Sequence, residues 1–199
     1  MSVPVPVERT SRRMTAREYL TWEPRQERRH EFRDGIVVAM AGGSLNHTLI
    51  CTNVNGLLNR QVRPPCRHLN GEVRLGIRQA RQFTYPDAAV VCDGIELDPD
   101  DPERSAVINP RLVVEVLSPS TAEYDRGKKF ALYRMIETFT TYLLISQGEA
   151  RVDLYTRGDE SWRFASVEGL TATLAVPDLK LALPMSELYA DVDFSRAAD

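Results

Sequence analysis

Two carboxylates set among apolar neighbours are the side chains of this sequence best suited to chemistry. Glu115 interrupts the stretch LVVEVL, which is typical of a strand buried on both faces. A buried carboxylate without a partner costs several kcal/mol, so Glu115 requires one. Asp87 ends the tripeptide YPD at the start of an earlier apolar strand. A proline is tolerated there because the first residue of a strand need not donate to the ladder.

An antiparallel pairing of these two strands would bring the carboxylates together. If Cys92 at the end of one strand lies near Arg111 at the start of the other, Asp87 falls opposite Glu115 to within one residue. Facing side chains in such a pair have Cβ atoms roughly 4.5 to 5.5 Å apart. Two carboxylates that close repel by about 4 kcal/mol at the effective dielectric of a protein surface. A proton, an arginine or lysine, or a hard divalent cation must therefore offset the repulsion.

A pair of adjacent lysines follows the second carboxylate. Lys128 and Lys129 are two of three lysines, and the other 22 basic residues are arginine. In the helix predicted after Glu115, Lys129 lies four residues from both Asp125 and Tyr133, so these three form a polar line on one side. Lys128 falls closer to an apolar stripe through Tyr124, Ala131, Leu132 and Met135. Either lysine could reach the carboxylates.

Two carboxylates, a bound cation and an ammonium group together favour phosphodiester hydrolysis. The cation lowers the pKa of its bound water and accepts a phosphate oxygen, while the lysine stabilises the charge that grows on phosphorus. Mg²⁺ is the expected cation because it is held by few carboxylates and keeps several waters. Mn²⁺ is expected to substitute for it.

The rest of the sequence predicts the elements that position these side chains. Capping-box patterns, Thr15 with Glu18 and Ser120 with Glu123, indicate the starts of two helices. The core order is helix, three strands, helix and strand, and a β meander is expected after it. The expected elements are a helix over 16–22, a hairpin turning at Asp34 and Gly35, a helix over 45–62 ended by Pro64 and Pro65, strands over 72–77, 87–93 and 111–117, a helix over 120–137, a strand over 141–146, and meander strands over 151–157, 162–167 and 171–176.

The length and charge of the chain limit its class. With 199 residues, of which 43% are hydrophobic, one globular domain is expected. Its core should cover about 44–146, and the ends 1–13 and 191–199 are expected to be flexible. A net charge of −3 provides no overall basic field, so a nucleic-acid contact must use a local patch. The candidate patch, which could equally be a solvated surface, contains Arg9, Arg12, Arg13, Arg17, Arg25, Arg28, Arg29 and Arg33.

Three further features concern compartment and loops. Cys51, Cys66 and Cys92 are odd in number and widely spaced, which favours reduced core thiols over disulfides or a zinc site. The N-terminus lacks the apolar segment of a signal peptide, and no run is long enough to span a membrane, so a cytoplasmic protein is expected. The acidic loop ELDPDDPE lacks the spacing of an EF-hand and is interpreted as solvated.

The ordered motifs resemble a known group of enzymes. YPD, then EV on the next strand, then a lysine, within the order helix, three strands, helix and strand, look like the PD-(D/E)xK restriction-endonuclease-like superfamily. Within it, the sequence is most similar to a bacterial endonuclease family labelled Uma, formerly a domain of unknown function. The resemblance runs through HEFRDGIVVAMAGGSLNH, YPDAAVV, LVVEVLSPST and DRGKKFALY and covers about 14–155.

The resemblance implies a role for each matching residue. It makes Asp87 and Glu115 metal ligands and Lys129 the catalytic lysine, because Leu117 stands where the superfamily usually has its lysine. His47 and Glu31 match further characteristic positions, although a helix cap and a polar hairpin residue are the plain alternatives. The segment ETFTTYLLIS departs from the family, with Leu143 in place of a tryptophan, which puts any substrate contact there in doubt.

These observations lead to one expectation with two alternatives. We expect a single α/β (α+β) domain of restriction-endonuclease-like fold that acts as a Mg²⁺-dependent endonuclease on nucleic acid, with DNA as the expected substrate. A homodimer would suit the cutting of both strands of a duplex. The alternatives are a nucleic-acid-binding or regulatory module that has lost the chemistry, and a metal-dependent phosphatase or another hydrolase.

Overall fold

A six-stranded sheet forms the centre of the molecule. The computed structural model of the chain describes residues 13–40 and 42–195. The strand order in this sheet is β11-β10-β9-β8-β6-β3, and only the β8/β9 neighbours run parallel among these described strands. The strands are β3 (Arg67–Asn70), β6 (Ala88–Val91), β8 (Pro110–Leu117), β9 (Thr141–Ser146), β10 (Arg151–Arg157) and β11 (Trp162–Glu168).

Alternation along β8 builds a separate apolar layer on each face of this sheet. Val114 and Val116 pack with apolar side chains of helix α2 (Leu45–Gln61), while Val113 and Leu117 pack on the other face with Tyr133. This is the period of two that a strand imposes on its side chains. Position 115 therefore shares the face of Val113 and Leu117, and its carboxylate points toward the helical segment that contains Tyr133.

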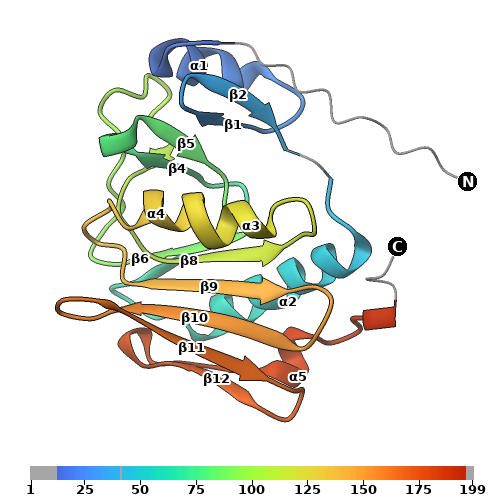
Figure 1. Cartoon of the computed structure of the whole chain (residues 1–199). Coiled ribbons are helices and arrows are strands. Elements are labelled where there is room, and N and C mark those ends of the chain that lie inside the picture. Colours follow the sequence, from blue (N-terminus) through green and yellow to red (C-terminus); the bar gives the residue numbers. More distant parts are fainter. Residues whose placement is uncertain (1–12, 41, 196–199) are drawn as a thin grey trace, which may run out of the picture.

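That helical segment lies between the central sheet and a second sheet (Figure 1). It consists of α3 (Ala122–Tyr124), the π-helical turn η3 (Asp125–Lys129) and α4 (Phe130–Tyr133). The predicted capping box at its start is wrong: Thr121 is the N-cap and makes no side-chain cap hydrogen bond, because its hydroxyl interacts with the Ser118 hydroxyl instead. Ser120 and Glu123 therefore do not form the expected box.

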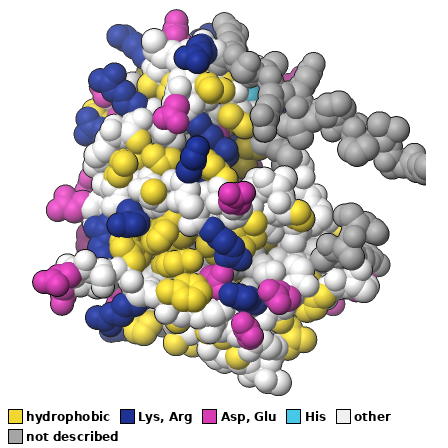
Figure 2. Space-filling view, in the orientation of Figure 1, with side chains coloured by type: hydrophobic (Ala, Val, Ile, Leu, Met, Phe, Trp, Pro, Cys, Tyr) yellow, Lys and Arg dark blue, Asp and Glu magenta, His cyan; other side chains and the backbone are white. Residues whose placement is uncertain are grey.

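The predicted apolar stripe of this segment lies mostly outside the core, although the half-buried Leu132 packs against it. Ala131 and Met135 are exposed, the latter by 48%, whereas Asp125, Lys129 and Tyr133 are buried. The polar line is buried because it faces Glu115 on one sheet and a carboxylate of the second sheet. These carboxylates supply the hydrogen-bond partners that water would otherwise provide. Hydrophobic side chains are correspondingly visible, mixed with charges, on the face of the molecule that carries α3 and α4 (Figure 2).

The second sheet has the order β2-β1-β5-β4-β7, and the N-terminal helix packs against it. The helix α1 (Ala16–Trp22) has the predicted capping box of Thr15 and Glu18, and the predicted hairpin turns at Asp34 and Gly35, both with positive φ. The elements are α1, η1 (Glu23–Arg25), β1 (His30–Arg33), β2 (Ile36–Ala39), β4 (Arg74–Ile77), η2 (Arg78–Ala80), β5 (Gln82–Thr84) and β7 (Ala106–Val107).

This arrangement corrects the identity of the first core strand. The stretch EVRLGI was predicted as the first of three core strands, but it forms β4 of the second sheet. The first strand of the central sheet is β3, whose sequence RHLN has one aliphatic residue and lies at the edge with mostly exposed or half-buried side chains. An edge strand needs little apolar patterning, so the more apolar neighbour was mistaken for it.

The C-terminal strands follow the expected meander only in part. β10 and β11 extend the central sheet, but β12 (Thr173–Val176) pairs with β13 (Leu181–Pro184) in a separate hairpin joined by η4 (Pro177–Leu179). The short helix α5 (Met185–Leu188) follows. Where fraying was expected, residues 191–195 contact α2: Asn46 donates a side-chain hydrogen bond of 2.8 Å to the carbonyl of Asp193. The segment TYLLIS forms β9, with its apolar pattern buried as predicted.

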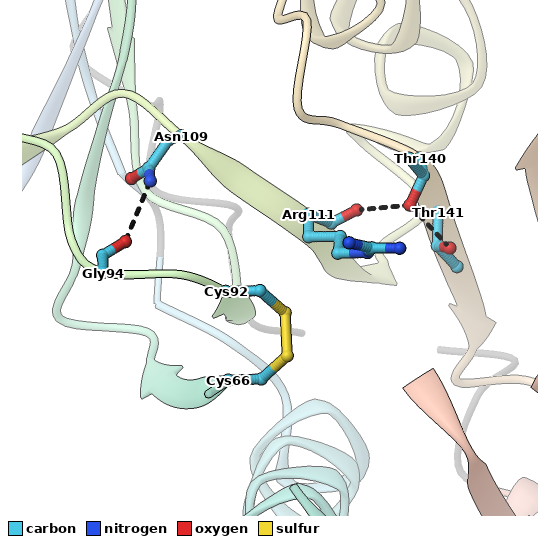
Figure 3. Close-up of a disulfide and its surroundings, with 7 residues drawn as sticks. All are labelled: Cys66, Cys92, Gly94, Asn109, Arg111, Thr140 and Thr141. Atoms are coloured by element: carbon cyan, nitrogen blue, oxygen red, sulfur yellow. Dashed lines mark hydrogen bonds between the residues drawn. A yellow bond between two sulfur atoms is a disulfide. The ribbon is translucent and has the colours of Figure 1, made fainter. Parts of the chain in front are cut away.

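The cysteine prediction is wrong for two of the three cysteines. Cys66 and Cys92 form a disulfide at one end of the β3/β6 pair (Figure 3). The reason is register: Arg67 pairs with Val91, so the residues just outside that pair stand opposite each other. Cys51 keeps a free thiol. Within 13–40 and 42–195, no helix combines the length and apolar character needed to cross a bilayer.

Candidate active site

Glu115 is buried against one lysine and one tyrosine of the helical segment. Its exposed fraction is 5%. The Lys129 Nζ lies 2.7 Å from Glu115 Oε1, and the Tyr133 hydroxyl donates a hydrogen bond of 2.8 Å to the same oxygen. Both contacts are made to Oε1, which leaves Oε2 for a further ligand. The buried glutamate therefore has the cationic partner that its position in an apolar strand requires.

Lys129 is shared by carboxylates from three elements. Besides Glu115, its Nζ lies 3.2 Å from Glu31 Oε1 on β1 and 3.7 Å from Asp125 Oδ1 on the preceding turn. The neighbouring Lys128 is exposed. Of the two adjacent lysines, Lys129 is the one that reaches the carboxylates. The π-helical turn η3 contains both Asp125 and Lys129, and such turns recur at functional sites.

Glu31 holds the far side of Lys129. Its carboxylate pairs with the Arg33 guanidinium and accepts a hydrogen bond from the Thr84 hydroxyl. Burial alone would raise the pKa of Glu31, but the charges of Lys129 and Arg33 outweigh burial and lower this pKa to about 2. Glu31 is thus an ionised group that fixes the ammonium between the two sheets.

Asp87 stands opposite Glu115, as predicted from the register. Ala88 pairs with Val114, and continuing this register by one residue places Asp87 opposite Glu115. The backbone N–H of Val116 donates a hydrogen bond of 2.6 Å to Asp87 Oδ2. A Cβ at Gly71 would lie 3.3 Å from the Asp87 carbonyl oxygen, so a larger residue would crowd this turn. Asp87 is therefore anchored by backbone contacts from two directions.

His47 approaches Asp87 from the first turn of α2. Its Nε2 lies 3.5 Å from Asp87 Oδ1. Its backbone N–H donates a hydrogen bond to the Ser44 hydroxyl, which caps the helix. A Cβ at Gly43 would lie 2.6 Å from His47 Nδ1, so a glycine at that position makes room for the imidazole. Burial would lower the pKa of His47, but the hydrogen bond and charge of Asp87 raise this pKa overall.

The site holds more carboxyl groups than permanent cations. Four carboxylates, Glu31, Asp87, Glu115 and Asp125, lie close to two permanent cations, Lys129 and Arg33. Burial raises the pKa of Glu115 to about 8, because the charges of Asp125 and Asp87 add to burial and together outweigh Lys129. A group of excess carboxylates with a free glutamate oxygen fits a divalent cation chemically, since hard oxygen donors are the ligands that Mg²⁺ prefers.

Sequence reasoning did not assign several contributors to this site. Asp125 and Tyr133 were recognised only as members of a polar line, and their spacing of four from Lys129 was the available signal. Cys51, whose Sγ lies 3.4 Å from His47 Nδ1, was interpreted as a core thiol, although it lies four residues after His47. Thr84 on β5 gave no signal, because its strand reaches the site only through the second sheet.

Most of the N-terminal arginine patch lies elsewhere. Arg33 is part of the site through Glu31, and its guanidinium lies 3.8 Å from the centre of the Tyr124 ring. Arg29 pairs with Glu72 at the surface instead. Arg9 and Arg12 lie outside the described residues. Arg13, Arg17 and Arg25 line a separate hollow beside α1, so the arginines of the patch are distributed over different parts of the described surface.

A second buried cation has a different environment. Arg74 on β4 donates hydrogen bonds of 3.0 Å to Glu23 and to Asp101. Asp101 belongs to the acidic loop that was interpreted as solvated. That interpretation is wrong for Asp98 and Asp101, which are 4% and 2% exposed, whereas the other acidic residues of the loop are exposed. Asp101 is buried because Arg74 and the backbone N–H groups of Ser105 and Ala106 bind its carboxylate.

A hollow adjoins the site on the side of the helical segment. Its volume is about 790 Å³, and side chains of the β1/β2 hairpin and of the helical segment line it, including Arg33, Tyr124 and Lys128. Arg33 lines this hollow and also contacts Glu31, whereas the four carboxylates of the site do not line it. The same face shows basic side chains among apolar ones (Figure 2).

Comparisons with known proteins identify the family and the fold of this chain. A family model named Uma2 and described as "Putative restriction endonuclease" matches residues 16–186. Two uncharacterized proteins of Synechocystis sp. are similar along most of their length: slr1290 is 35% identical over 92% of this chain and 94% of its own, and sll1609 is 33% identical over 86% and 97%. A crystal structure from Anabaena variabilis, described as "a putative nuclease belonging to DUF820", has a TM-score of 0.69, at 20% identity over 89% of this chain and 98% of that one.

Proposed function

Since this chain belongs to the Uma2 family of restriction-endonuclease-like proteins, we propose that it is a Mg²⁺-dependent nuclease that hydrolyses phosphodiester bonds of nucleic acid, with DNA as the substrate. The observation that carries the proposal is the buried ammonium of Lys129, which lies 2.7 Å from Glu115 among more carboxylates than it can neutralise. A group of this kind is suited to a cation and a phosphate that arrive together.

Asp87 and Glu115 are the residues that would hold the cation. Asp87 has one oxygen fixed by the Val116 N–H, and Glu115 has one oxygen fixed by Lys129 and Tyr133, so each carboxylate keeps its orientation before any ligand binds. A bound Mg²⁺ would supply Lewis acidity, lowering the pKa of a water molecule and neutralising charge on the phosphate. Mn²⁺ prefers similar oxygen ligands and should replace it.

Lys129 would stabilise the negative charge that develops on the phosphate oxygens. Its ammonium is already desolvated and held by Glu31, Glu115 and Asp125, so it need not reorganise during the reaction. Glu31 then acts as a positioning residue, because its own contacts are with Lys129, Arg33 and Thr84. His47 borders Asp87 and would exchange a proton with the water or the leaving oxygen.

The hollow beside the site suits the approach of a polyanionic backbone. Arg33 and Lys128 line it, and guanidinium and ammonium groups are the usual partners of phosphates. With a net charge of −3 the chain lacks an overall attraction for nucleic acid, so a local basic border is required. A two-fold dimer would present two such sites to the two strands of a duplex.

Cleavage assays on mixed substrates test the proposal. Double-stranded DNA, single-stranded DNA and RNA are incubated with the protein and Mg²⁺ or Mn²⁺, and wild type is compared with Asp87→Asn. The matched control is Asp93→Asn, which removes the same charge at an exposed position. We expect metal-dependent cleavage of DNA by wild type and by Asp93→Asn and its loss in Asp87→Asn.

Other outcomes of this assay contradict the proposal in distinct ways. Cleavage that survives in Asp87→Asn places the chemistry elsewhere or in a contaminant. Binding of nucleic acid without cleavage in any metal indicates a module that has lost the chemistry. Hydrolysis of a small phosphoester without cleavage of polynucleotides indicates a phosphatase.

A further inference from the structure

We propose that His47, Cys51 and Asp87 form a binding site for a thiophilic divalent cation such as Zn²⁺, distinct in its donors from the Asp87 and Glu115 pair. Each of the three side chains offers one ligand atom, and these three atoms all lie within 4.8 Å of one another. Cys51 supplies the donor that distinguishes this site, because a thiolate is a poor ligand for Mg²⁺ and a strong one for Zn²⁺.

The spacing of the donors follows from the helix. His47 and Cys51 are four residues apart on α2, so their side chains project from the same face. The distance from Cys51 Sγ to His47 Nδ1 is 3.4 Å, and His47 Nε2 lies 3.5 Å from Asp87 Oδ1. Zinc bonds of about 2.0 to 2.3 Å place tetrahedral ligand atoms roughly 3.3 to 3.8 Å apart. The two distances involve different ring nitrogens of His47, and one ion binds only one of them. The imidazole must therefore turn for the three ligand atoms, which lie within 4.8 Å of one another, to reach tetrahedral spacing.

A half-buried amide connects the two elements that carry the donors. The Asn55 side-chain NH₂ donates hydrogen bonds of 2.7 Å to the Cys51 carbonyl and 3.1 Å to the Asp87 carbonyl. Its oxygen interacts with His68 Nε2 at 2.7 Å. The helix turn at Cys51 and the strand entrance at Asp87 are thereby fixed relative to each other. Such contacts from residues behind the ligands normally set the affinity of a metal site.

Three protein ligands leave the fourth tetrahedral position to water or to an incoming group. On binding, the Cys51 thiol releases its proton to solvent and coordinates as the thiolate. The consequence for catalysis rests on the proposed function. Asp87 belongs to both donor sets, so Zn²⁺ held by Cys51 and His47 withdraws Asp87 from Mg²⁺. Zn²⁺ should therefore inhibit the Mg²⁺-dependent cleavage.

Cobalt spectroscopy tests the site without depending on nuclease activity. Co²⁺ is titrated into the full chain, and a thiolate-to-cobalt charge-transfer band is followed together with the visible bands of tetrahedral Co²⁺. We expect both signals in wild type, and the loss of the charge-transfer band in Cys51→Ser. The matched control is His30→Gln, which alters a histidine of β1 that belongs neither to the donor set nor to the contacts of Asn55 and should retain the band. Added Zn²⁺ should displace Co²⁺ and abolish the signals.

A second measurement links the site to activity. The Zn²⁺ concentration that halves cleavage is compared in wild type and Cys51→Ser, each relative to its own rate without Zn²⁺. Loss of a metal ligand should raise that concentration by at least about tenfold. The absence of a Cys51-dependent cobalt band in a folded protein, judged by circular dichroism, would overturn the site even if cleavage is observed. A Cys51-dependent band in a protein that cleaves nothing would leave the site standing and contradict the proposed nuclease.

Discussion

Two buried cations in the described part of the chain are surrounded by carboxylates, and one of these two groups has the features of an active site. The Arg74 cluster consists of Arg74, Glu23, Tyr85, Asp101 and Ser105; the Lys129 cluster consists of Lys129, Glu31, Asp125 and Glu115. Both cations are nearly excluded from solvent, with exposed fractions of 3% and 5%. Burial of a charged residue therefore does not by itself distinguish a catalytic from a structural role.

The difference lies in how completely the carboxylates are satisfied. In the Arg74 cluster both oxygens of Glu23 and both oxygens of Asp101 accept hydrogen bonds, from Arg74, Tyr85 and backbone N–H groups. In the Lys129 cluster, Glu115 is held through Oε1, and Asp87 adds a further charge nearby. A closed network stabilises the fold, whereas an open one with excess charge can bind a cation.

The largest expected effect is on the stability of the closed cluster. Arg74→Met should lower the free energy of unfolding by about 3 to 5 kcal/mol, because two buried carboxylates lose their shared cation. Urea unfolding followed by circular dichroism measures this change. The activity per folded molecule should remain within about twofold of wild type, since the cluster touches none of the proposed ligands. A loss of cleavage in Arg74→Met without a change in the free energy of unfolding would contradict the structural role of the Arg74 cluster.

The corresponding change in the open cluster should act mainly on chemistry. Lys129→Met should lower the cleavage rate by on the order of 10²- to 10³-fold, as expected when one charge-stabilising donor is removed. Its effect on stability should be smaller than that of Arg74→Met, because burial and the neighbouring carboxylates already raise the pKa values of Glu115 and Asp125, so these groups can take up protons. Single-turnover cleavage and urea unfolding of the same preparations separate the two effects.

The pH dependence of stability should show the raised pKa of Glu115. Folding raises this pKa from 4.5 to about 8, so the stability that Glu115 contributes is fully present below about pH 4.5 and is lost as the pH rises through about 8. Glu115→Gln cannot ionise. The unfolding free energy of wild type minus that of this variant should therefore fall between these pH values and be constant above them.

A neighbouring carboxylate provides the control for this titration. The pKa of Glu31 is lowered to about 2, so its contribution is already complete above about pH 4.5 and is lost only in stronger acid. The difference between wild type and Glu31→Gln should consequently show no such fall between pH 4.5 and 8. Equal slopes for the two variants would mean that Glu115 is not the group that titrates.

The smallest expected effects come from removing one phenol from each cluster. Tyr133 donates to Glu115, and Tyr85 donates to Glu23 over 2.7 Å. Each substitution to phenylalanine should cost about 1 to 2 kcal/mol of stability. Only Tyr133→Phe should also change cleavage, by a few-fold, because the oxygen that loses its donor belongs to a proposed metal ligand. A similar change in cleavage with Tyr85→Phe would show that the Arg74 cluster is coupled to the site.

Particular residues show how far sequence reasoning reached. The register that sets Asp87 opposite Glu115, the capping box of α1 and the hairpin at Asp34 and Gly35 were all predicted, because each depends on neighbours along the chain or on two strands joined by one loop. The disulfide, the membership of β4 in another sheet and the burial of Asp101 were missed. Each of these depends on which strands become neighbours after the chain has folded back.

By itself, the sequence determined that Glu115 needs a partner, since an apolar strand leaves a carboxylate without water. It left a proton, an arginine or lysine, and a divalent cation open, and it offered two adjacent lysines of the predicted helix as candidates. Only the tertiary structure decided between Lys128 and Lys129, because the second sheet brings Glu31 against one side of the segment and thereby buries its polar line rather than its apolar stripe. Side-chain spacing along one helix defines its faces, but the charges that surround a face after packing decide which of them is buried.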